Sequence, residues 1–398
     1  MGGNGFALSL AFPSPRPRHV PADMTPLLKH HGSRLVGLGL LALAAACSGS
    51  STQVVASSGT AGLLDPQTAK IELGRKLLFD DRLSRPRGMA CATCHDPQLG
   101  WGDGRPQGKG IQDHTLSGDT DGDGLQDHDT HLAVAGNRFK TILTGRNTPT
   151  VYNSHVFPNL FWDGRAGDLA HQSVFPFEGF NEMNSSWDEH IIPLLESDEE
   201  YLALFQDAFG DQRVSRLRAG DALGAYEATI SVFDTPYDAF LAGDLTALTP
   251  EADAGRQLFF GKAGCATCHP APLLTNMGFA NLGVPEAGIN ALYGNLDYGH
   301  GKRDDLTVFP HQPIDNTADY MKFKVPQLRM VALTGPYMHN GAMATLEEVV
   351  EFLDAGGGPD LSGHGTKDPA IVPLGLTAQE KSDLVAFLRD GLTGTPID

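Results

Sequence analysis

The sequence predicts a mainly α-helical protein with long loops, and three observations support this. Helix-initiating patterns recur along the chain, alternating strand patterns are scarce, and one short helical unit occurs twice. Glycine and proline supply 47 and 26 of the 398 residues, which indicates long Gly/Pro-rich connections, expected at about 96–150 and 270–325. The net charge of −19 (29 − 48) disfavours a nucleic-acid-binding protein, whose footprint is usually basic.

The repeated unit is an amphipathic helix that ends just before a pair of cysteines. Residues 72–79, ELGRKLLF, precede the first pair, and residues 253–260, DAGRQLFF, precede the second. Duplication of one small helical unit is the simplest account of this similarity.

Further helices are indicated by capping residues and by apolar spacing. A capping box at Ser197 begins a helix that ends at Gly210, and two further helices begin at Thr345 and Thr377. Another helix is predicted from apolar residues at helical spacing, namely Leu223, Tyr226, Ile230 and Phe233.

The amino terminus has the pattern of an export signal. Residues 35–46, LVGLGLLALAAA, are apolar and follow Lys29 and Arg34, but a membrane span needs about twenty residues. The AAAC ending resembles a bacterial lipoprotein signal, which would make Cys47 the lipid-bearing residue; the alternative is an ordinary cleaved signal. We therefore predict a signal segment at 1–47, a flexible Ser/Gly/Thr-rich tether at 48–63, and a periplasmic protein that is lipid-anchored to a membrane.

The remaining cysteines form two identical CATCH runs, at 91–95 and 265–269. Cys-x-x-Cys-His is the attachment sequence of c-type haem, in which two thioethers hold the porphyrin and the histidine ligates the iron. The expected haem residues are Cys91, Cys94, His95, Cys265, Cys268 and His269. A four-cysteine zinc site is the alternative, but zinc does not explain a histidine at both fifth positions.

Four further segments accompany the two runs: GRNTPTV at 145–151, FWDGRA at 161–166, FKVPQLR at 323–329 and LTGPYMHNG at 333–341. In this order they resemble the bacterial dihaem cytochrome c peroxidase family, including its MauG-like oxidase branch. The resemblance spans residues 64–398. It implies two cytochrome c-like haem domains, an N-terminal peroxidatic domain at 64–240 and a C-terminal electron-transfer domain at 241–398.

The resemblance also assigns roles over the first haem. The family's catalytic glutamate and glutamine match Glu182 and Gln172, and its interhaem tryptophan matches Trp162. Cleavage of hydrogen peroxide needs a base that takes a proton from one oxygen and returns it to the other, which suits a carboxylate. On spacing alone, Glu182 would be one surface acid among many, and Trp162 one core aromatic.

Calcium is the second implied cofactor. The family binds one calcium between its haem domains through residues that match Asn147, Thr334 and Pro336. An acidic segment resembles calcium loops of other proteins and predicts a second calcium, with a solvated loop as the alternative. Its carboxylates are Asp119, Asp121, Asp123 and Asp127.

The sequence departs from the family at both expected sixth-ligand positions. Phe139 stands where the family's blocking histidine lies, which favours a first haem that is open at rest unless His128 or His131 substitutes. Leu353 stands at the methionine or tyrosine position of the second haem. The nearby alternative ligands are Met338, His339 and Met343.

Three functions follow from these features. The first is a peroxidase that reduces hydrogen peroxide with electrons from a small cytochrome c or cupredoxin, relayed from the C-terminal to the N-terminal haem. The second is a MauG-like oxidase of a protein or small molecule, and the third is a non-enzymatic electron carrier. Glu182 and Gln172 argue against the carrier, while Phe139 and Leu353 give the oxidase some weight. Dimers are usual in the family, so a homodimer stays open.

Overall fold

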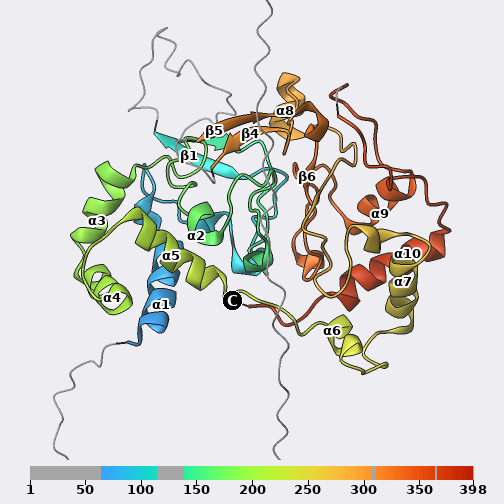
Figure 1. Cartoon of the computed structure of the whole chain (residues 1–398), viewed down its shortest axis with the longest axis horizontal. Coiled ribbons are helices and arrows are strands. Elements are labelled where there is room, and N and C mark those ends of the chain that lie inside the picture. The colour runs from blue at the N-terminus through green and yellow to red at the C-terminus, as the bar shows by residue number, and fades with distance from the viewer. Residues whose placement is uncertain (1–63, 114–138, 307–310, 364, 398) are drawn as a thin grey trace, which may run out of the picture. The chain divides into compact units, whose positions relative to one another are not determined.

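The computed structural model describes residues 64–113, 139–306, 311–363 and 365–397. This part of the chain is rich in helices and has little strand, as the sequence predicts (Figure 1). The α-helices are α1 (Pro66–Phe79), α2 (Leu169–Gln172), α3 (Ile192–Glu196), α4 (Glu199–Phe209), α5 (Arg216–Glu227), α6 (Pro236–Leu241), α7 (Pro250–Phe260), α8 (Gly288–Tyr293), α9 (Leu346–Asp354) and α10 (Ala378–Ala386).

The segments predicted as long loops contain short antiparallel strand pairs. The strands are β1 (Lys109–Asp113), β2 (Phe139–Leu143), β3 (Phe279–Ala280), β4 (Lys302–Asp305), β5 (Gln312–Asp315) and β6 (Phe323–Lys324). β1 pairs with β2, β3 with β6 and β4 with β5. These strands could not be predicted, because runs of two to five residues are too short for an alternating pattern.

The two helices that precede the CATCH runs are built alike. Asp65 and Thr249 cap α1 and α7, and each is followed by a proline, which suits the first helical position. Each helix then crosses another helix at a glycine: Gly74 of α1 lies against α5, and Gly255 of α7 lies against α10. A Cβ atom at either glycine would lie 1.9 Å from a backbone oxygen of the crossed helix. The repeat in the sequence is therefore a repeated helix crossing.

Two hydrophobic clusters surround these crossings. The first contains α1, α4 and α5 side chains, such as Leu77, Phe205 and Leu223. The second contains α7, α9 and α10 side chains, such as Phe259 and Val350. Figure 1 shows the first set of helices on the left and the second on the right. We refer to these regions as the N-terminal half and the C-terminal half.

Two helix boundaries differ from the sequence prediction. The cap of α4 is Asp198, whose carboxylate accepts from the amides of Glu200 and Tyr201, because the Ser197 hydroxyl donates to Leu194 at the end of α3. The helix predicted through Ile230 and Phe233 ends at Glu227. Ile230 is nevertheless buried, so its apolar character reflects the core and not the helix. The predicted end at Gly210 and the caps at Thr345 and Thr377 are confirmed.

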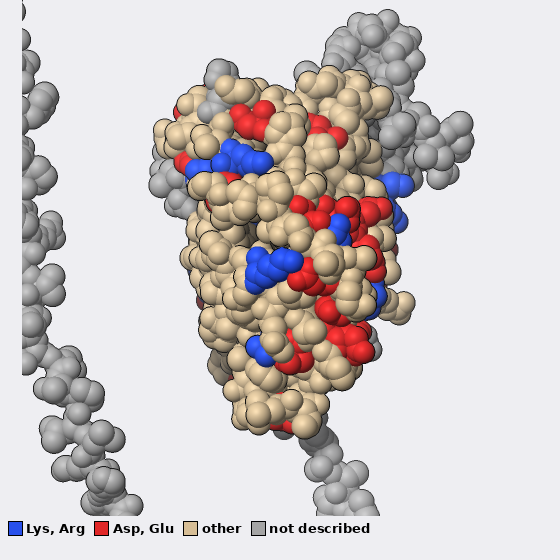
Figure 2. All heavy atoms as spheres, turned by 90° about the vertical axis from the view of Figure 1, so that its right-hand side faces the viewer, with Lys and Arg blue, Asp and Glu red and all other residues tan. Residues whose placement is uncertain are grey.

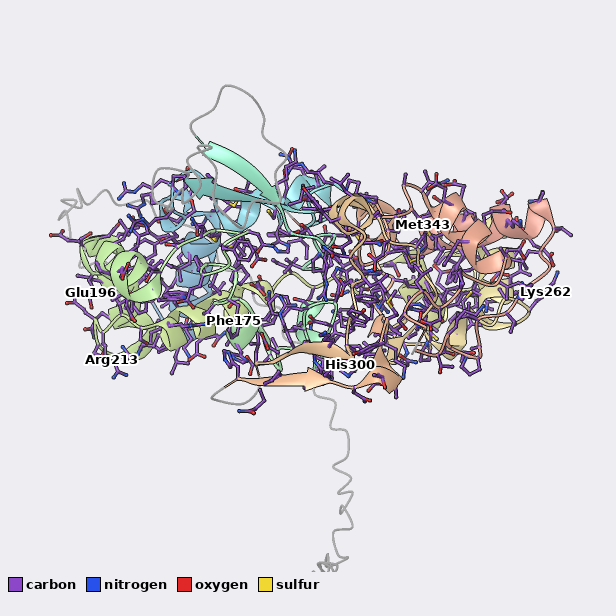
Figure 3. The ribbon with its side chains drawn as sticks, turned by 90° about the horizontal axis from the view of Figure 1, so that it is seen from above. Phe175, Glu196, Arg213, Lys262, His300 and Met343 are labelled. Carbon is purple, nitrogen blue, oxygen red and sulfur yellow. The ribbon has the colours of Figure 1, made fainter. Side chains whose placement is uncertain are left out.

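The end of the chain joins the two halves. After α10 the chain returns to the N-terminal half, where the Ile397 carbonyl accepts a hydrogen bond of 2.8 Å from the indole of buried Trp101. His300 also lies between the halves: its Nδ1 is 2.7 Å from the Asp163 carbonyl oxygen. Figure 3 shows His300 between Glu196 and Arg213 at one end and Lys262 at the other. Within the described ranges, no helix combines the length and the apolar character needed to cross a membrane.

Candidate functional site: two cavities around the CATCH runs

Each CATCH run begins with a single 3-10 turn that brings its three functional side chains together. The amide of His95 donates to the Cys91 carbonyl at 2.9 Å, and the amide of His269 donates to the Cys265 carbonyl at 2.9 Å. The cysteines of both runs are free thiols. This turn is what the two-residue spacing predicts, with both sulfurs and the histidine on one short segment.

The histidines are fixed in the orientation that iron ligation requires. Nδ1 of His95 lies 3.1 Å from the Trp101 carbonyl oxygen, and Nδ1 of His269 lies 2.9 Å from the Leu274 carbonyl oxygen. A ring whose Nδ1 donates to a carbonyl presents Nε2 as a lone-pair donor. Burial lowers the pKa of both histidines, which favours the neutral form that binds metal.

A cavity of about 340 Å³ adjoins the first run, and Cys91, Cys94 and His95 line it. Glu182, Gln172 and Trp162 line the same cavity. Sequence-distant residues that the family resemblance grouped over the first haem are thus together in space. Space bounded by two thiols and an oriented imidazole fits a covalently attached haem.

Glu182 lies in a loop that β1 holds. The amide of Ile111 donates to the Glu182 carbonyl at 2.9 Å, and Gly110 lies so close that a Cβ would meet the Asn181 carbonyl at 2.0 Å. Burial raises the pKa of the Glu182 carboxyl, while nearby Arg165 acts in the opposite direction. Gln172 is the last residue of α2, whose first turn is capped by Asp168.

Sequence reasoning missed a second buried carboxyl in this cavity. Glu227, the last residue of α5, is 8% exposed and lines the cavity with Glu182. Burial raises its pKa to about 8. The only signal in the sequence was its position three residues before buried Ile230, which does not distinguish a buried acid from a surface one.

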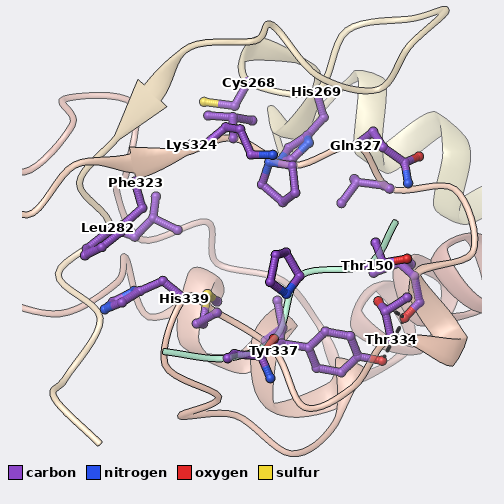
Figure 4. Close-up of a pocket in the computed structure, with 18 of the residues that line it drawn as sticks. Thr150, Cys268, His269, Leu282, Phe323, Lys324, Gln327, Thr334, Tyr337 and His339 are labelled. Carbon is purple, nitrogen blue, oxygen red and sulfur yellow. Dashed lines mark hydrogen bonds between the residues drawn. The ribbon is translucent and has the colours of Figure 1, made fainter. Parts of the chain in front are cut away.

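A second cavity of about 260 Å³ adjoins the other run, and its lining is largely aliphatic and aromatic. Figure 4 shows His269 and Lys324 on one side of this pocket, with Thr334, Tyr337 and His339 on the other. Three of the sixth-ligand positions from the sequence, Leu353, Met338 and His339, line it, whereas Met343 is buried outside its described lining. Burial lowers the pKa of His339 to about 3.

The two cavities share a wall. Residues 147–150, Ser154, Trp162 and Lys324 line both of them. The Trp162 indole donates to the Asn147 carbonyl at 2.9 Å, and the Trp162 carbonyl accepts from the Lys324 amide at 2.8 Å. Trp162 is therefore held at the boundary between the cavities, through its indole by the N-terminal half and through its main chain by the C-terminal half.

A buried ion network lies next to this wall, and the sequence did not reveal it. Arg146 bonds to Asp163 and to Asp297, both at 2.6 Å, and Arg165 bonds to Asp163 at 2.9 Å. Burial would raise the pKa of Asp163, but the two arginines hold it below its usual value. The partners come from three distant segments, so only the fold brings them together.

The residues that the family resemblance assigns to calcium are part of the same cavity lining. Asn147, Thr334 and Pro336 line the second cavity, and the Asn147 amide donates to the His339 carbonyl at 2.8 Å. The Asn147 side-chain amide donates to the Arg105 carbonyl at 2.8 Å, which orients its oxygen as an acceptor. Across the described part of the chain, no cluster of three or more His, Cys, Asp or Glu side chains could hold a metal ion.

Some predicted residues lie outside the described part. They are Cys47, Asp119, Asp121, Asp123, Asp127, His128 and His131. Phe139 is the first residue of β2, opposite Asp113 of β1.

Comparison with known proteins identifies the family. The family model described as di-haem cytochrome c peroxidase matches residues 68–246. The chain is 36% identical over 345 residues to the cytochrome-c peroxidase IdrP1 of Denitromonas iodatirespirans, covering 82% of each protein. It is 33% identical over 323 residues to the methylamine utilization protein MauG of Methylorubrum extorquens, covering 80% of this chain and 77% of that protein.

Solved structures agree with this assignment. A MauG-like protein associated with microbial copper homeostasis superposes with a TM-score of 0.59 at 28% identity, covering 82% of this chain and 89% of the other. The diheme peroxidase BthA from Burkholderia thailandensis shares the fold, with a TM-score of 0.61 at 24% identity, covering 83% of this chain and 87% of the other. With two oriented CATCH runs and relatives that match over most of its length, the chain belongs to the di-haem cytochrome c peroxidase family.

Proposed function

We propose that the chain is a peroxidase that reduces hydrogen peroxide at the haem of His95, with electrons relayed from the haem of His269. The observation that carries this proposal is the lining of the first cavity, where Glu182 and Gln172 accompany Cys91, Cys94 and His95. Curated relatives with 36% and 33% identity are named cytochrome-c peroxidases, which supports the same activity.

The haems supply the iron that binds peroxide and the redox steps that this reaction needs. His95 and His269 would ligate the two irons through Nε2, since Nδ1 of each lies near a backbone carbonyl oxygen. The four cysteines would form the thioethers. These residues fit the cofactor by donor type, spacing and orientation.

Glu182 and Gln172 would carry out the proton chemistry. The Glu182 carboxylate accepts the proton of one peroxide oxygen and returns it to the other, which leaves as water. The Gln172 amide donates a hydrogen bond that orients the peroxide. A raised pKa suits Glu182 to this task, because a carboxyl that titrates nearer neutral pH exchanges protons more readily.

Trp162 would transfer electrons between the haems. Its indole is part of the shared wall and is fixed by Asn147. A calcium ion held by Asn147, Thr334 and Pro336 would fix the geometry of this boundary, since oxygen ligands suit that hard cation. A second calcium would bind Asp119, Asp121, Asp123 and Asp127.

The mature chain would comprise two haem domains, 64–240 and 241–398, after a signal and a tether. The protein would be located in the periplasm and anchored to a membrane by an acyl chain on Cys47. Its electron donor would be a small cytochrome c or a cupredoxin. Figure 2 shows acidic side chains interspersed with lysines and arginines on the face that it presents. Glu347, Glu351 and Asp354 of α9 form ion pairs with Arg389 and Lys381. The net charge of −19 suits a donor with exposed lysines. The protein would form a homodimer, as is usual in the family.

A MauG-like oxidase is the second candidate. Phe139 and Leu353 favour it, because neither side chain can ligate iron at positions where the family's peroxidases place a ligand. The 33% identity to MauG is nearly as high as that to the peroxidases. A carrier without enzymatic activity would not need Glu182 or Gln172 in the first cavity.

The experiment that separates these functions is a steady-state assay with purified holoprotein. Reduced small cytochrome c and hydrogen peroxide are mixed, and the oxidation of the cytochrome is followed. A peroxidase oxidises two cytochromes for each peroxide consumed. Slow peroxide consumption without cytochrome oxidation would favour the oxidase, and no consumption at all would leave only the carrier.

A further inference from the structure

The wall between the two cavities contains one charged side chain. Among the residues that line both cavities, only Lys324 carries a formal charge; its companions are 147–150, Ser154 and Trp162. A group that lies against this wall, in either cavity, would therefore be close to this ammonium.

Lys324 is held in this place by its backbone. It is the second residue of β6, opposite Phe279 of β3, and its amide donates to the Trp162 carbonyl at 2.8 Å. Its Nζ lies 4.0 Å from the centre of the Phe157 ring. Figure 4 shows the side chain directed into the second cavity on the side of His269.

The ammonium has no acidic partner among the side chains that the structure describes. The neighbouring cations differ in this respect, since Arg146 and Arg165 are balanced by Asp163 and Asp297. Burial lowers the pKa of Lys324 to about 8, so it stays mostly protonated at neutral pH. A cation withdrawn from water is costly unless an anion or an equivalent acceptor accompanies it.

The c-type haem that the CATCH runs imply carries two propionate groups, and a propionate at the shared wall would supply the carboxylate that Lys324 lacks. We propose that Lys324 is the counter-ion of a haem propionate at the shared wall, and that its charge raises the reduction potentials of both haems. Reduction adds one negative charge to a haem, and a nearby cation stabilises that charge. Lys324 is thus a positioning residue that favours electron entry into the haem pair. The inference rests on the proposed haem sites.

The test is potentiometric titration of the holoprotein, followed by the visible spectra of the haems. In Lys324→Met, which keeps the length of the side chain and removes the charge, both midpoint potentials shift to lower values. Lys324→Arg keeps the charge and stays near wild type. The matched control is Lys322→Met, two residues away, because the Lys322 ammonium is partly exposed and paired with Asp319 at 2.8 Å; it leaves both midpoints unchanged.

Unchanged midpoints in Lys324→Met, with both haems attached, would overturn the proposal and leave Lys324 as a packing partner of Phe157. A shift confined to one haem would contradict the shared role. If Lys324→Met does not accumulate, Lys324→Gln gives the same test. Covalent haem staining of the denatured wild-type protein tests the proposed function separately. If two haems are not attached, the proposed function fails, whatever the result for the Lys324 variants.

Discussion

The two halves of the molecule use the same local construction around cavities that differ in their acidic residues. In each half a capped helix crosses another helix at a glycine and leads to a CATCH turn whose histidine is fixed by a backbone carbonyl. Glu182 and Glu227 line the first cavity, whereas the described lining of the second contains no acidic side chain and includes aliphatic side chains of α9 and α10. We propose that a duplicated unit provides the two haem sites, and that side chains from outside this unit determine which site reacts with peroxide and which relays electrons.

The largest expected effect concerns the polar cavity. Glu182→Gln keeps the shape of the side chain but removes the base, so peroxide turnover should fall about 100-fold or more. Haem content and resting spectra should stay as in wild type. Steady-state turnover with a reduced cytochrome measures this effect. The matched control is Glu178→Gln, an exposed glutamate of the same loop, which should keep full activity; equal turnover in both variants would leave Glu182 without a role.

The helix crossing that both halves share can be disrupted by substituting its glycine, Gly74 in α1 or Gly255 in α7. Gly74→Ala and Gly255→Ala place a methyl group 1.9 Å from a backbone oxygen, so each should lower the free energy of unfolding by about 1–3 kcal/mol or more. Denaturant titration of the holoproteins measures the loss. Gly102→Ala is the control, because its Cβ would have no neighbour closer than 3.6 Å. A loss at only one of the two crossings would show that the repeat is not equivalent in the two halves.

A smaller effect is the pH dependence of stability that buried Glu227 should cause. The pKa of Glu227 rises from 4.5 to about 8 on folding, so the folded state holds a proton that the unfolded state releases between these values. Stability should therefore fall as pH rises through this window, by at most about 1.4 kcal/mol per pH unit. Denaturant titrations from pH 5 to pH 8 should show a flatter profile for Glu227→Gln than for wild type. Exposed Glu196→Gln should keep the wild-type slope, and a variant at 227 that also keeps it would show that Glu227 is ionised in the folded protein.

The features that could be predicted from the sequence are those that depend on residues close together in the chain. The CATCH turns, the mainly helical fold and the caps at Thr345 and Thr377 depend on residues within a few positions of one another. The predicted cap at Ser197 was wrong. The Ser197 hydroxyl donates to the Leu194 carbonyl of α3, and the neighbouring Asp198 caps α4 instead.

The features that could not be predicted depend on distant segments. Lys324 and Glu227 look like ordinary surface charges in the sequence, and only the fold brings them to the cavities. The pairing of Arg146 with Asp297 joins residues 151 positions apart. The grouping of Glu182 and Gln172 was predicted only through the family resemblance, since no spacing rule relates a loop residue to the end of α2.

The most direct test of the different roles of the two cavities is a crystal structure of the all-ferric holoprotein soaked in cyanide, which occupies the coordination position that peroxide needs. With Phe139 where the family's blocking histidine stands, cyanide should bind without prior reduction. Cyanide should bind at the haem of His95, within hydrogen-bond reach of Glu182 and Gln172. Cyanide bound only at the haem of His269, or an iron at His95 capped by a protein side chain, would contradict it.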